Sequence, residues 1–166
     1  KVHDMNNSIK LNWCRVGEHA LPVPTRANAD DAGIDLAVTV DPAGYPKHPL
    51  PLDGRIGVAA GTTIVFGTGW RVAIPSGWCG LIMVRSSVGK AGWDLESSGL
   101  IDSSYRGEIA IPLIFRGDPL DPRRYVTHGD RMAQMLLLPA PPVASVEVSE
   151  LDATSRGAGG FGSTGR

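Results

Sequence analysis

The sequence lacks the features that mark a disulfide-rich, membrane-spanning or secreted protein. Its 166 residues contain only two cysteines, Cys14 and Cys79, which stand far apart and belong to no Cys-x-x-Cys or Cys/His cluster. They predict neither a disulfide framework nor a zinc site. Apolar runs such as Met135–Leu138 are far too short to span a bilayer, and the first residues do not form the apolar stretch of a signal peptide. We therefore expect a cytoplasmic protein.

An excess of charge of either sign is also missing. The chain has 16 Lys and Arg against 17 Asp and Glu, a formal net charge of -1, and both signs are spread along it. This balance gives no electrostatic footprint for nucleic acid or a membrane surface, so we expect neither as a partner. The length favours one domain with its own core.

Sustained helical periodicity is absent too, whereas Gly (21) and Pro (13) are frequent. This composition predicts an all-β fold, a sandwich, jelly roll or barrel of many short strands. Pro112 lies inside one expected strand and indicates an edge or a bulge there. Only Val88–Trp93 leaves room for a short helical turn. The expected strands are Asp35–Val40, Thr62–Phe66, Trp70–Ile74, Gly80–Val84, Ile109–Phe115, Arg131–Leu138 and Ser145–Val148.

The stretch Gly99–Glu108 is the most informative part of the sequence. Apolar residues at every second position from Ile109 to Phe115 predict a half-buried strand that leaves it. Asp102 is the only acid in its interior and stands three residues from Tyr105. We interpret the stretch as a hairpin arm that presents one carboxylate. The alternative is a turn-forming aspartate that bonds its own backbone.

Two further stretches are candidates for binding phosphate. Arg85, Ser86 and Ser87 follow an apolar strand and offer a cation and two hydroxyls, although a surface turn is the commoner meaning of such a tripeptide. Gln134 places an amide within an apolar strand, which makes it either a structural hydrogen-bonder or a ligand to something bound. Asp35 is flanked by apolar residues, an unusual place for an unpaired charge.

The C-terminal residues are rich in glycine, and Gly157, Gly159 and Gly162 satisfy a G-x-G-x-x-G pattern. A dinucleotide-binding turn needs a helix after this pattern and a Walker loop needs a lysine, and the sequence offers neither. A flexible terminus and an anion-binding loop remain as alternatives. The second alternative rests on a guanidinium, a ring and two hydroxyls, those of Arg156, Phe161, Ser163 and Thr164.

Five separated stretches, taken in order, resemble the five sequence motifs of the trimeric deoxyuridine triphosphate nucleotidohydrolases (dUTPases). They are Ala32–Leu36, Arg85–Ser87, Gly99–Glu108, Gly129–Gln134 and Arg156–Gly165. The resemblance implies a distorted jelly-roll or β-barrel subunit and a homotrimer that exchanges C-terminal arms, with each active site assembled from three chains. It implies an N-terminal extension over 1–20, a core over 21–150 and an arm over 151–166 that closes a neighbouring active site.

The same resemblance implies hydrolysis of dUTP to dUMP and pyrophosphate, which supplies dUMP for thymidylate synthesis and keeps uracil out of DNA. Asp102 matches the family's water-activating carboxylate, and Gln134 orders the water or joins the phosphate-binding groups. Tyr105 matches the ring that packs on the deoxyribose and excludes a 2′-hydroxyl. The backbone implied to pair with the uracil edge is that of Gly99, Leu100 and Ile101.

The remaining implied roles concern the triphosphate and its Mg²⁺. Because Mg²⁺ is held mainly by substrate phosphates, Asp35 acts indirectly, through water molecules of the metal or by supporting the site. The groups implied to bind the nucleotide are Arg85, Ser86, Ser87 and Arg131, with Arg156, Phe161, Gly162, Ser163 and Thr164 supplied by the arm of a neighbouring subunit.

The chain departs from the family pattern in three places. Ser104 stands where the family often has an acid, Ser87 where it usually has glycine, and the proline-rich loop Asp41–Arg55 is long. A dCTP deaminase of the same fold is an alternative, but the glutamate that it needs for proton transfer falls at Pro112. A non-catalytic regulatory protein is the alternative of a different class, and the intact Asp102 disfavours it.

Overall fold

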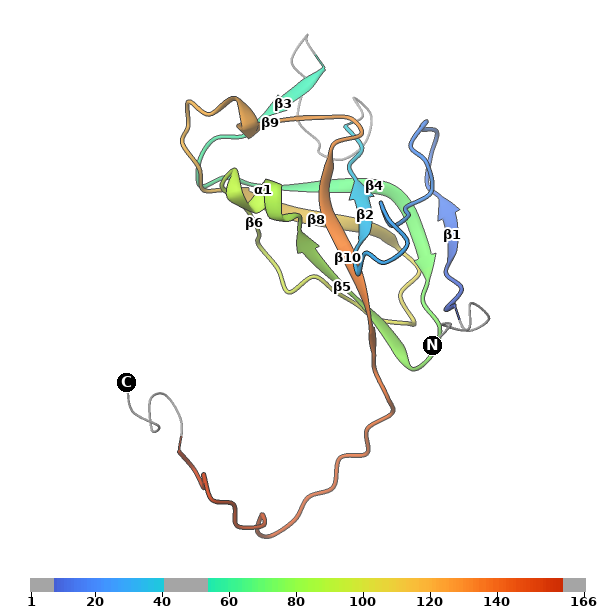
Figure 1. The fold of residues 1–166 in the computed structure, drawn as a ribbon, viewed down its shortest axis with the longest axis vertical. Helices are drawn as coiled ribbons and strands as arrows, with labels where there is room; N and C mark the ends of the chain where they lie inside the picture. Colours follow the sequence, from blue (N-terminus) through green and yellow to red (C-terminus); the bar gives the residue numbers. More distant parts are fainter. Residues whose placement is uncertain (1–7, 41–53, 160–166) are drawn as a thin grey trace.

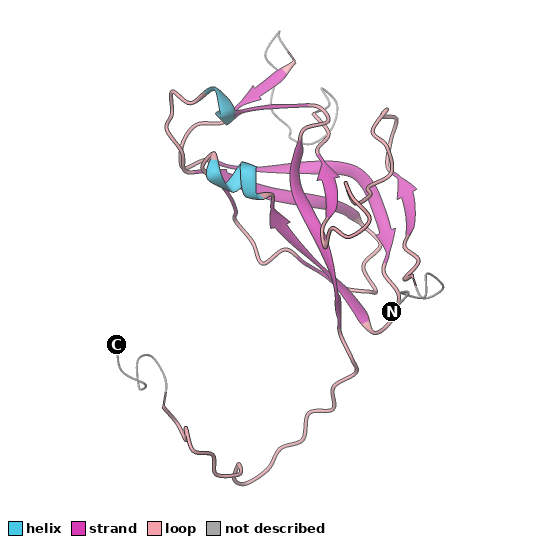
Figure 2. Ribbon diagram, viewed as in Figure 1, coloured by secondary structure: helices cyan, strands magenta, loops and turns pink. Residues whose placement is uncertain are grey.

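The computed structural model describes residues 8–40 and 54–159, and nearly all of its regular structure is β-strand (Figures 1 and 2). This confirms the predicted all-β class. The strands are β1 Asn12–Arg15, β2 Ile34–Ala37, β3 Arg55–Gly57, β4 Thr63–Ala73, β5 Trp78–Val84, β6 Trp93–Leu95, β7 Leu100–Ile101, β8 Glu108–Phe115, β9 Tyr125–Thr127 and β10 Arg131–Pro139. One short helix, α1, spans Ser86–Lys90, and a 3₁₀ turn spans Pro122–Arg124.

Two four-stranded antiparallel sheets enclose the core. Their strand orders are β1-β4-β8-β6 and β2-β10-β5-β7, and β3 and β9 form a small sheet at one end (Figure 1). The alternation predicted from Ile109 to Phe115 is confirmed, because every second residue of β8 in this interval is fully buried. The inward faces of both sheets supply the remaining core, including Leu36, Phe66 and Met135. Burial of these apolar side chains holds the two sheets together.

Two strand predictions need correction. The segments Thr62–Phe66 and Trp70–Ile74 belong to one strand, β4, which continues through a shift of register between Gly67 and Arg71. The predicted strand Ser145–Val148 is wrong, because this segment carries no regular structure. Its valines are exposed, and within the described residues it pairs with no strand.

Pro112 lies in β8, which has a neighbour on both sides, so the predicted edge position is wrong. The strand tolerates proline because β6 ends at Leu95, opposite Leu113. Beyond that point the Pro112 carbonyl accepts a hydrogen bond from the N–H of Glu96 at 3.0 Å. The N–H that proline lacks falls where the ladder with β6 has ended. The predicted helical turn is α1, which begins two residues earlier, at Ser86.

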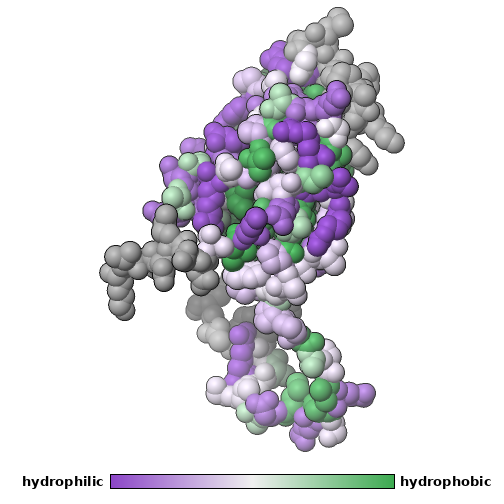
Figure 3. Space-filling model, turned by 90° about the vertical axis from the view of Figure 1, so that its right-hand side faces the viewer, coloured by the Kyte–Doolittle hydropathy of each residue, from purple (hydrophilic) through white to green (hydrophobic). Residues whose placement is uncertain are grey.

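After β10 the chain leaves the sheets. Residues 140–159 contain no helix or strand and run away from the body of the molecule (Figure 1). Apolar side chains gather on this segment, in the lower part of Figure 3, where Val143, Val146 and Leu151 are each about four-fifths exposed (84%, 79% and 81%). Within the described parts of the chain, none of the helices has the length and apolar character needed to cross a membrane.

Candidate active site

Asp35 is the centre of a charged cluster that joins three parts of the chain. Its Oδ1 accepts from Nε of Arg85 and its Oδ2 from a terminal nitrogen of Arg131, both at 2.9 Å. The Asp35 side chain is only 14% exposed, and the two guanidiniums replace the water that it loses. The sequence marked Asp35 as an oddly placed charge, and the cluster, which we call the Asp35 clamp, resolves it.

The clamp borders a cavity of about 390 Å³. Strand pairing places Gln134 of β10 directly opposite Asp35 of β2, so both side chains point to the outer face of the sheet. Gly33 makes room for the amide, since a Cβ on Gly33 would lie 2.4 Å from Gln134 Oε1. The cavity thus gathers predicted site residues that are distant in sequence, namely Asp35, Arg85, Ser86, Ser87 and Gln134. Hydroxyl, amide and guanidinium donors of this kind suit a phosphate chain.

Arg131 faces a neighbouring hollow of about 480 Å³, which it lines together with Arg85, Ser87, Trp93 and Arg123. The Asp35 clamp therefore stands between two openings. Both contain guanidinium groups, and the second is walled by aromatic rings as well.

The Gly99–Glu108 stretch forms the predicted hairpin between β7 and β8. Gly99 has φ +67°, and a Cβ there would lie 2.5 Å from the carbonyl oxygen of Ile82, so only glycine fits. The Gly99 carbonyl in turn accepts from the N–H of Ile82 at 2.8 Å. Leu100 and Ile101 pair with Leu81 and Gly80 of β5. These contacts fix the base of the hairpin on the edge of the sheet.

The tip of the hairpin is a tight turn from Asp102 to Tyr105, closed by a hydrogen bond from the Tyr105 N–H to the Asp102 carbonyl at 3.1 Å. Asp102 is exposed, and among residues 8–40 and 54–159 its carboxylate has no hydrogen-bond or ion-pair partner. Tyr105 is also exposed, with its hydroxyl donating to the carbonyl of Glu108 at 3.0 Å. The hairpin therefore presents a carboxylate and an aromatic face outward.

A single chain does not bring the hairpin and the cavity together. The hairpin pairs with β5 at Gly80 and Leu81, whereas Arg85 follows the other end of β5. At about 3.3 Å per residue, Gly80 and Arg85 are roughly 17 Å apart along the strand. The residues that line the cavity do not include Asp102. Within one chain, the predicted base is therefore remote from the predicted phosphate groups.

The arm residues are also remote from the cavity. Arg156 is exposed on the extended segment, and its Nε donates to the carbonyl of Gly159 within a local turn at 2.9 Å. Four predicted arm residues lie outside the described residues, namely Phe161, Gly162, Ser163 and Thr164.

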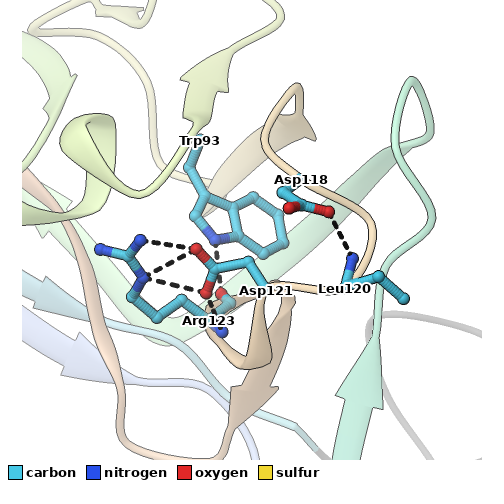
Figure 4. A network of polar contacts seen from close by, with 5 residues as sticks. All are labelled: Trp93, Asp118, Leu120, Asp121 and Arg123. Carbon is cyan, nitrogen blue, oxygen red and sulfur yellow. Dashed lines mark hydrogen bonds and ion pairs between the residues drawn. The ribbon is translucent and has the colours of Figure 1, made fainter.

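One network at the rim of the second hollow was not predicted (Figure 4). The carboxylate of Asp121 accepts from the backbone N–H and the guanidinium of Arg123, and these hydrogen bonds lower the pKa of Asp121 from 3.8 to about 2. The indole N–H of Trp93 donates to the carbonyl of Arg123 at 2.9 Å. The spacing Asp121-Pro122-Arg123 is a local capping signal that could have found the first of these contacts.

Comparison with known proteins gives a consistent result. The dUTPase family model matches residues 19–165. A deoxyuridine 5′-triphosphate nucleotidohydrolase of Nocardia farcinica is 43% identical over 147 residues, which are 87% of this chain and 79% of the relative. One of Corynebacterium glutamicum is 39% identical over 150 residues, 88% of this chain and 89% of the relative.

Solved structures agree on the fold. A dUTPase of Staphylococcus bacteriophage 80alpha in complex with dUpNHpp has a TM-score of 0.76 at 21% identity, covering 95% of this chain and 99% of its own. The dUTPase of phage phi11 of S. aureus, which coordinates a structural Mg(II) ion, has a TM-score of 0.67 at 21% identity, covering 85% of this chain and 97% of its own. With a family model matched over most of its length and relatives at about 40% identity, this chain belongs to the dUTPase family.

Proposed function

We propose that this chain hydrolyses dUTP to dUMP and pyrophosphate. The observation that carries the proposal is the division of the candidate site into two complementary halves. One half is a cavity with guanidinium, hydroxyl and amide donors at Arg85, Ser86 and Gln134. The other is an outward hairpin with an unpaired carboxylate at Asp102. The two relatives described above carry the name of this activity over nearly the same length of chain.

In the proposed reaction, Asp102 takes a proton from a water molecule that attacks the α-phosphorus in line with the leaving pyrophosphate. An exposed carboxylate in a tight turn is free to accept that proton once a second surface covers it. Gln134 orients the water or the α-phosphate, and Arg85, Ser86, Ser87 and Arg131 stabilise the charge that develops on the phosphates.

The hairpin also supplies recognition of the base and sugar. The backbone groups of Gly99, Leu100 and Ile101 read the uracil edge, and the outer face of Tyr105 covers the deoxyribose. Because mismatched groups would be left unpaired, such a site can reject cytosine by as much as about 10⁴-fold.

The residues present fit a magnesium ion that is bound through the substrate. Both oxygens of Asp35 are engaged by Arg85 and Arg131, which leaves this carboxylate for an indirect contact through water. When bound, Mg²⁺ supplies positive charge to the triphosphate, which itself provides the ligands. Asp35 keeps the two guanidiniums in place beside that charge.

We further propose that the two halves meet between the subunits of a homotrimer. On the outer face of the β2-β10-β5-β7 sheet, register aligns Leu136, Leu81 and Leu100, and Met83 and Leu100 are 44% and 56% exposed. An apolar row of this kind, continuous with the cavity through Met83, is typical of a buried interface. The arm beyond Pro139 carries Arg156 away from its own cavity, which supports exchange of arms between subunits, with Phe161, Gly162, Ser163 and Thr164 closing a neighbour's site.

The test is pyrophosphate release from dUTP, dCTP, UTP and dTTP, assayed side by side with and without Mg²⁺. Release from dUTP alone, dependent on Mg²⁺, is the expected result. Ammonia from dCTP would support the deaminase instead, although Pro112 offers no carboxyl for that reaction. No release from any of the four nucleotides would support a non-catalytic regulatory protein. Light scattering of the same sample measures the number of subunits.

A further inference from the structure

Glu108 lies at the foot of the hairpin, but its side chain turns away from the hairpin toward β4. Its Oε1 accepts a hydrogen bond from the N–H of Gly69 at 2.7 Å. Gly69 is buried and has φ +72°, so its backbone is accessible to few other partners. The sequence and the family motifs assign Glu108 no role of its own.

The contact occurs where the β4–β8 ladder is interrupted. Gly67 pairs with Ala110 and Arg71 pairs with Glu108, so β4 has two more residues than β8 over this interval. Residues in such a bulge lose their ladder partners, and a buried N–H without a partner is costly. The Thr68 hydroxyl accepts from the N–H of Trp70 at 3.2 Å, and the Glu108 carboxylate serves Gly69.

Gly67 makes room for this carboxylate. A Cβ on Gly67 would lie only 2.4 Å from Oε1 of Glu108, and real Cβ atoms do not come so close to other atoms. The bulge is held from its other side as well, since the Gly69 carbonyl lies 2.8 Å from the N–H of Val16 and 2.7 Å from Nε2 of His19. The position of Glu108 is therefore fixed by two layers of structure.

The hairpin tip is tied to the backbone of the same residue. The Tyr105 hydroxyl donates to the Glu108 carbonyl at 3.0 Å, and Gly107 has no side chain that would displace the phenol. The Arg106 guanidinium donates to the carbonyls of Ser103 and Tyr105 at 2.6 and 2.7 Å, which stiffens the turn. One continuous set of contacts thus leads from Gly69 through Glu108 to the turn that carries Asp102.

We propose that Glu108 is a positioning residue for the hydrolysis of dUTP. Its carboxylate fixes the β4 bulge and thereby sets the direction in which the hairpin presents Asp102 and Tyr105. The inference rests on the proposed function but goes beyond it, because Glu108 touches neither the substrate nor the water. A misplacement of about 1 Å is enough to lower a rate by about 10²-fold, so a distant contact of this kind can matter for turnover.

The first test compares Glu108→Ala with Glu108→Gln in the full chain. The alanine variant leaves the Gly69 N–H unpaired, and we expect kcat/KM for dUTP to fall by about tenfold or more, mainly through kcat. The glutamine variant keeps an acceptor of the same length and is expected to remain within about threefold of wild type. Thermal unfolding of each variant, read by circular dichroism, shows how much of any loss comes from unfolded protein.

Asp118→Ala is the matched control. The Asp118 carboxylate also accepts one backbone N–H, that of Leu120 at 2.8 Å, but in an exposed loop beyond the opposite end of β8 (Figure 4). We expect its kcat/KM to stay at the wild-type value. An equal loss in Asp118→Ala and Glu108→Ala would reduce the role of Glu108 to general stability and overturn the proposal.

Gly67→Ala provides an independent route to the same contact, because the added methyl group displaces the carboxylate. We expect it to lower kcat/KM by itself and to add little in the Glu108→Ala background. If Glu108→Ala does not fold, unchanged kcat/KM in Gly67→Ala overturns the proposal. A wild-type protein that leaves dUTP intact contradicts the proposed function. An active wild type beside an equally active Glu108→Ala variant contradicts only the role of Glu108.

Discussion

The Asp35 clamp and the Asp102 hairpin each present a carboxylate, and the structure treats the two in opposite ways. Asp35 is largely buried, and both of its oxygens are bound by arginines of the same chain. Asp102 is exposed, and its turn is organised through backbone groups alone. A paired carboxylate has little capacity left for a proton or a metal, whereas an unpaired one at the surface has all of it. The difference indicates that the phosphate half is prebuilt within one chain and that the hairpin awaits another surface.

The largest expected effect comes from the unpaired carboxylate. Asp102→Asn keeps the size and the turn but cannot accept the proton of the attacking water, so kcat for dUTP should fall by about 10²-fold or more. Binding of a non-hydrolysable analogue should change little, because the phosphate half is intact. Steady-state kinetics and calorimetric titration measure the two quantities. Unchanged turnover would remove Asp102 as the base.

A mixing experiment tests whether the two halves come from different chains. Asp102→Asn damages only the hairpin, and Gln134→Ala damages only the cavity. Equimolar unfolding and refolding of the two variants together should restore about a quarter of the wild-type rate, since about one site in four would combine both intact halves. Each variant refolded alone is the control. If the mixture stays as inactive as its components, both halves belong to one chain.

The paired carboxylate should affect binding more than chemistry. Asp35→Asn removes the charge that holds Arg85 and Arg131, and we expect KM for dUTP to rise by about tenfold with a smaller change in kcat. The free energy of unfolding should fall by about 2 kcal/mol, because hydrogen bonds to a charged group are lost. Urea unfolding and kinetics at several Mg²⁺ concentrations measure both. A variant that instead loses kcat and retains KM would assign Asp35 a role in the chemical step.

Much of this contrast lies beyond sequence analysis. The alternation in β8 predicts its buried face, because period-2 patterns depend only on neighbouring residues. The opposition of Asp35 and Gln134 depends on the register of strands that are distant in sequence, which no local pattern encodes. The Gly67-Thr68-Gly69 segment resembles a turn, yet β4 continues through it because Glu108 supplies the missing partner from another strand. Ser145–Val148 shows the converse, since its strand-like pattern has no neighbour to pair with among the described residues.

Gly99→Ala tests how firmly the base of the hairpin is fixed. The new Cβ would meet the Ile82 carbonyl and would force φ +67° on an alanine, so the free energy of unfolding should fall by about 2 kcal/mol and kcat should fall as well. Gly77→Ala is a matched control, since Gly77 has φ +82° but nothing within 4 Å of its added Cβ. The difference between the variants isolates the contact with Ile82. Equal losses in both would show that the hairpin tolerates displacement.

Asp121 combines the two situations, because it is paired like Asp35 and exposed like Asp102. Its hydrogen bonds with Arg123 lower its folded-state pKa from 3.8 to about 2, so the folded state favours the carboxylate. The resulting stabilisation is present above about pH 4 and is lost as the pH falls toward about 2. Because the pair is exposed, solvent and salt screen it, and the effect should be the smallest of the series.

Thermal unfolding of wild type and Asp121→Asn from pH 7 to pH 2 measures this contribution. We expect a small difference in unfolding midpoint at neutral pH that closes between about pH 4 and pH 2, with unchanged hydrolysis of dUTP at pH 7. A difference that persists at pH 2 would mean that Asp121 acts through its shape at the turn and not through its charge. A loss of activity at neutral pH would instead connect the rim of the second hollow with the nucleotide. Either result would show that pairing alone does not distinguish structural carboxylates from functional ones in this protein.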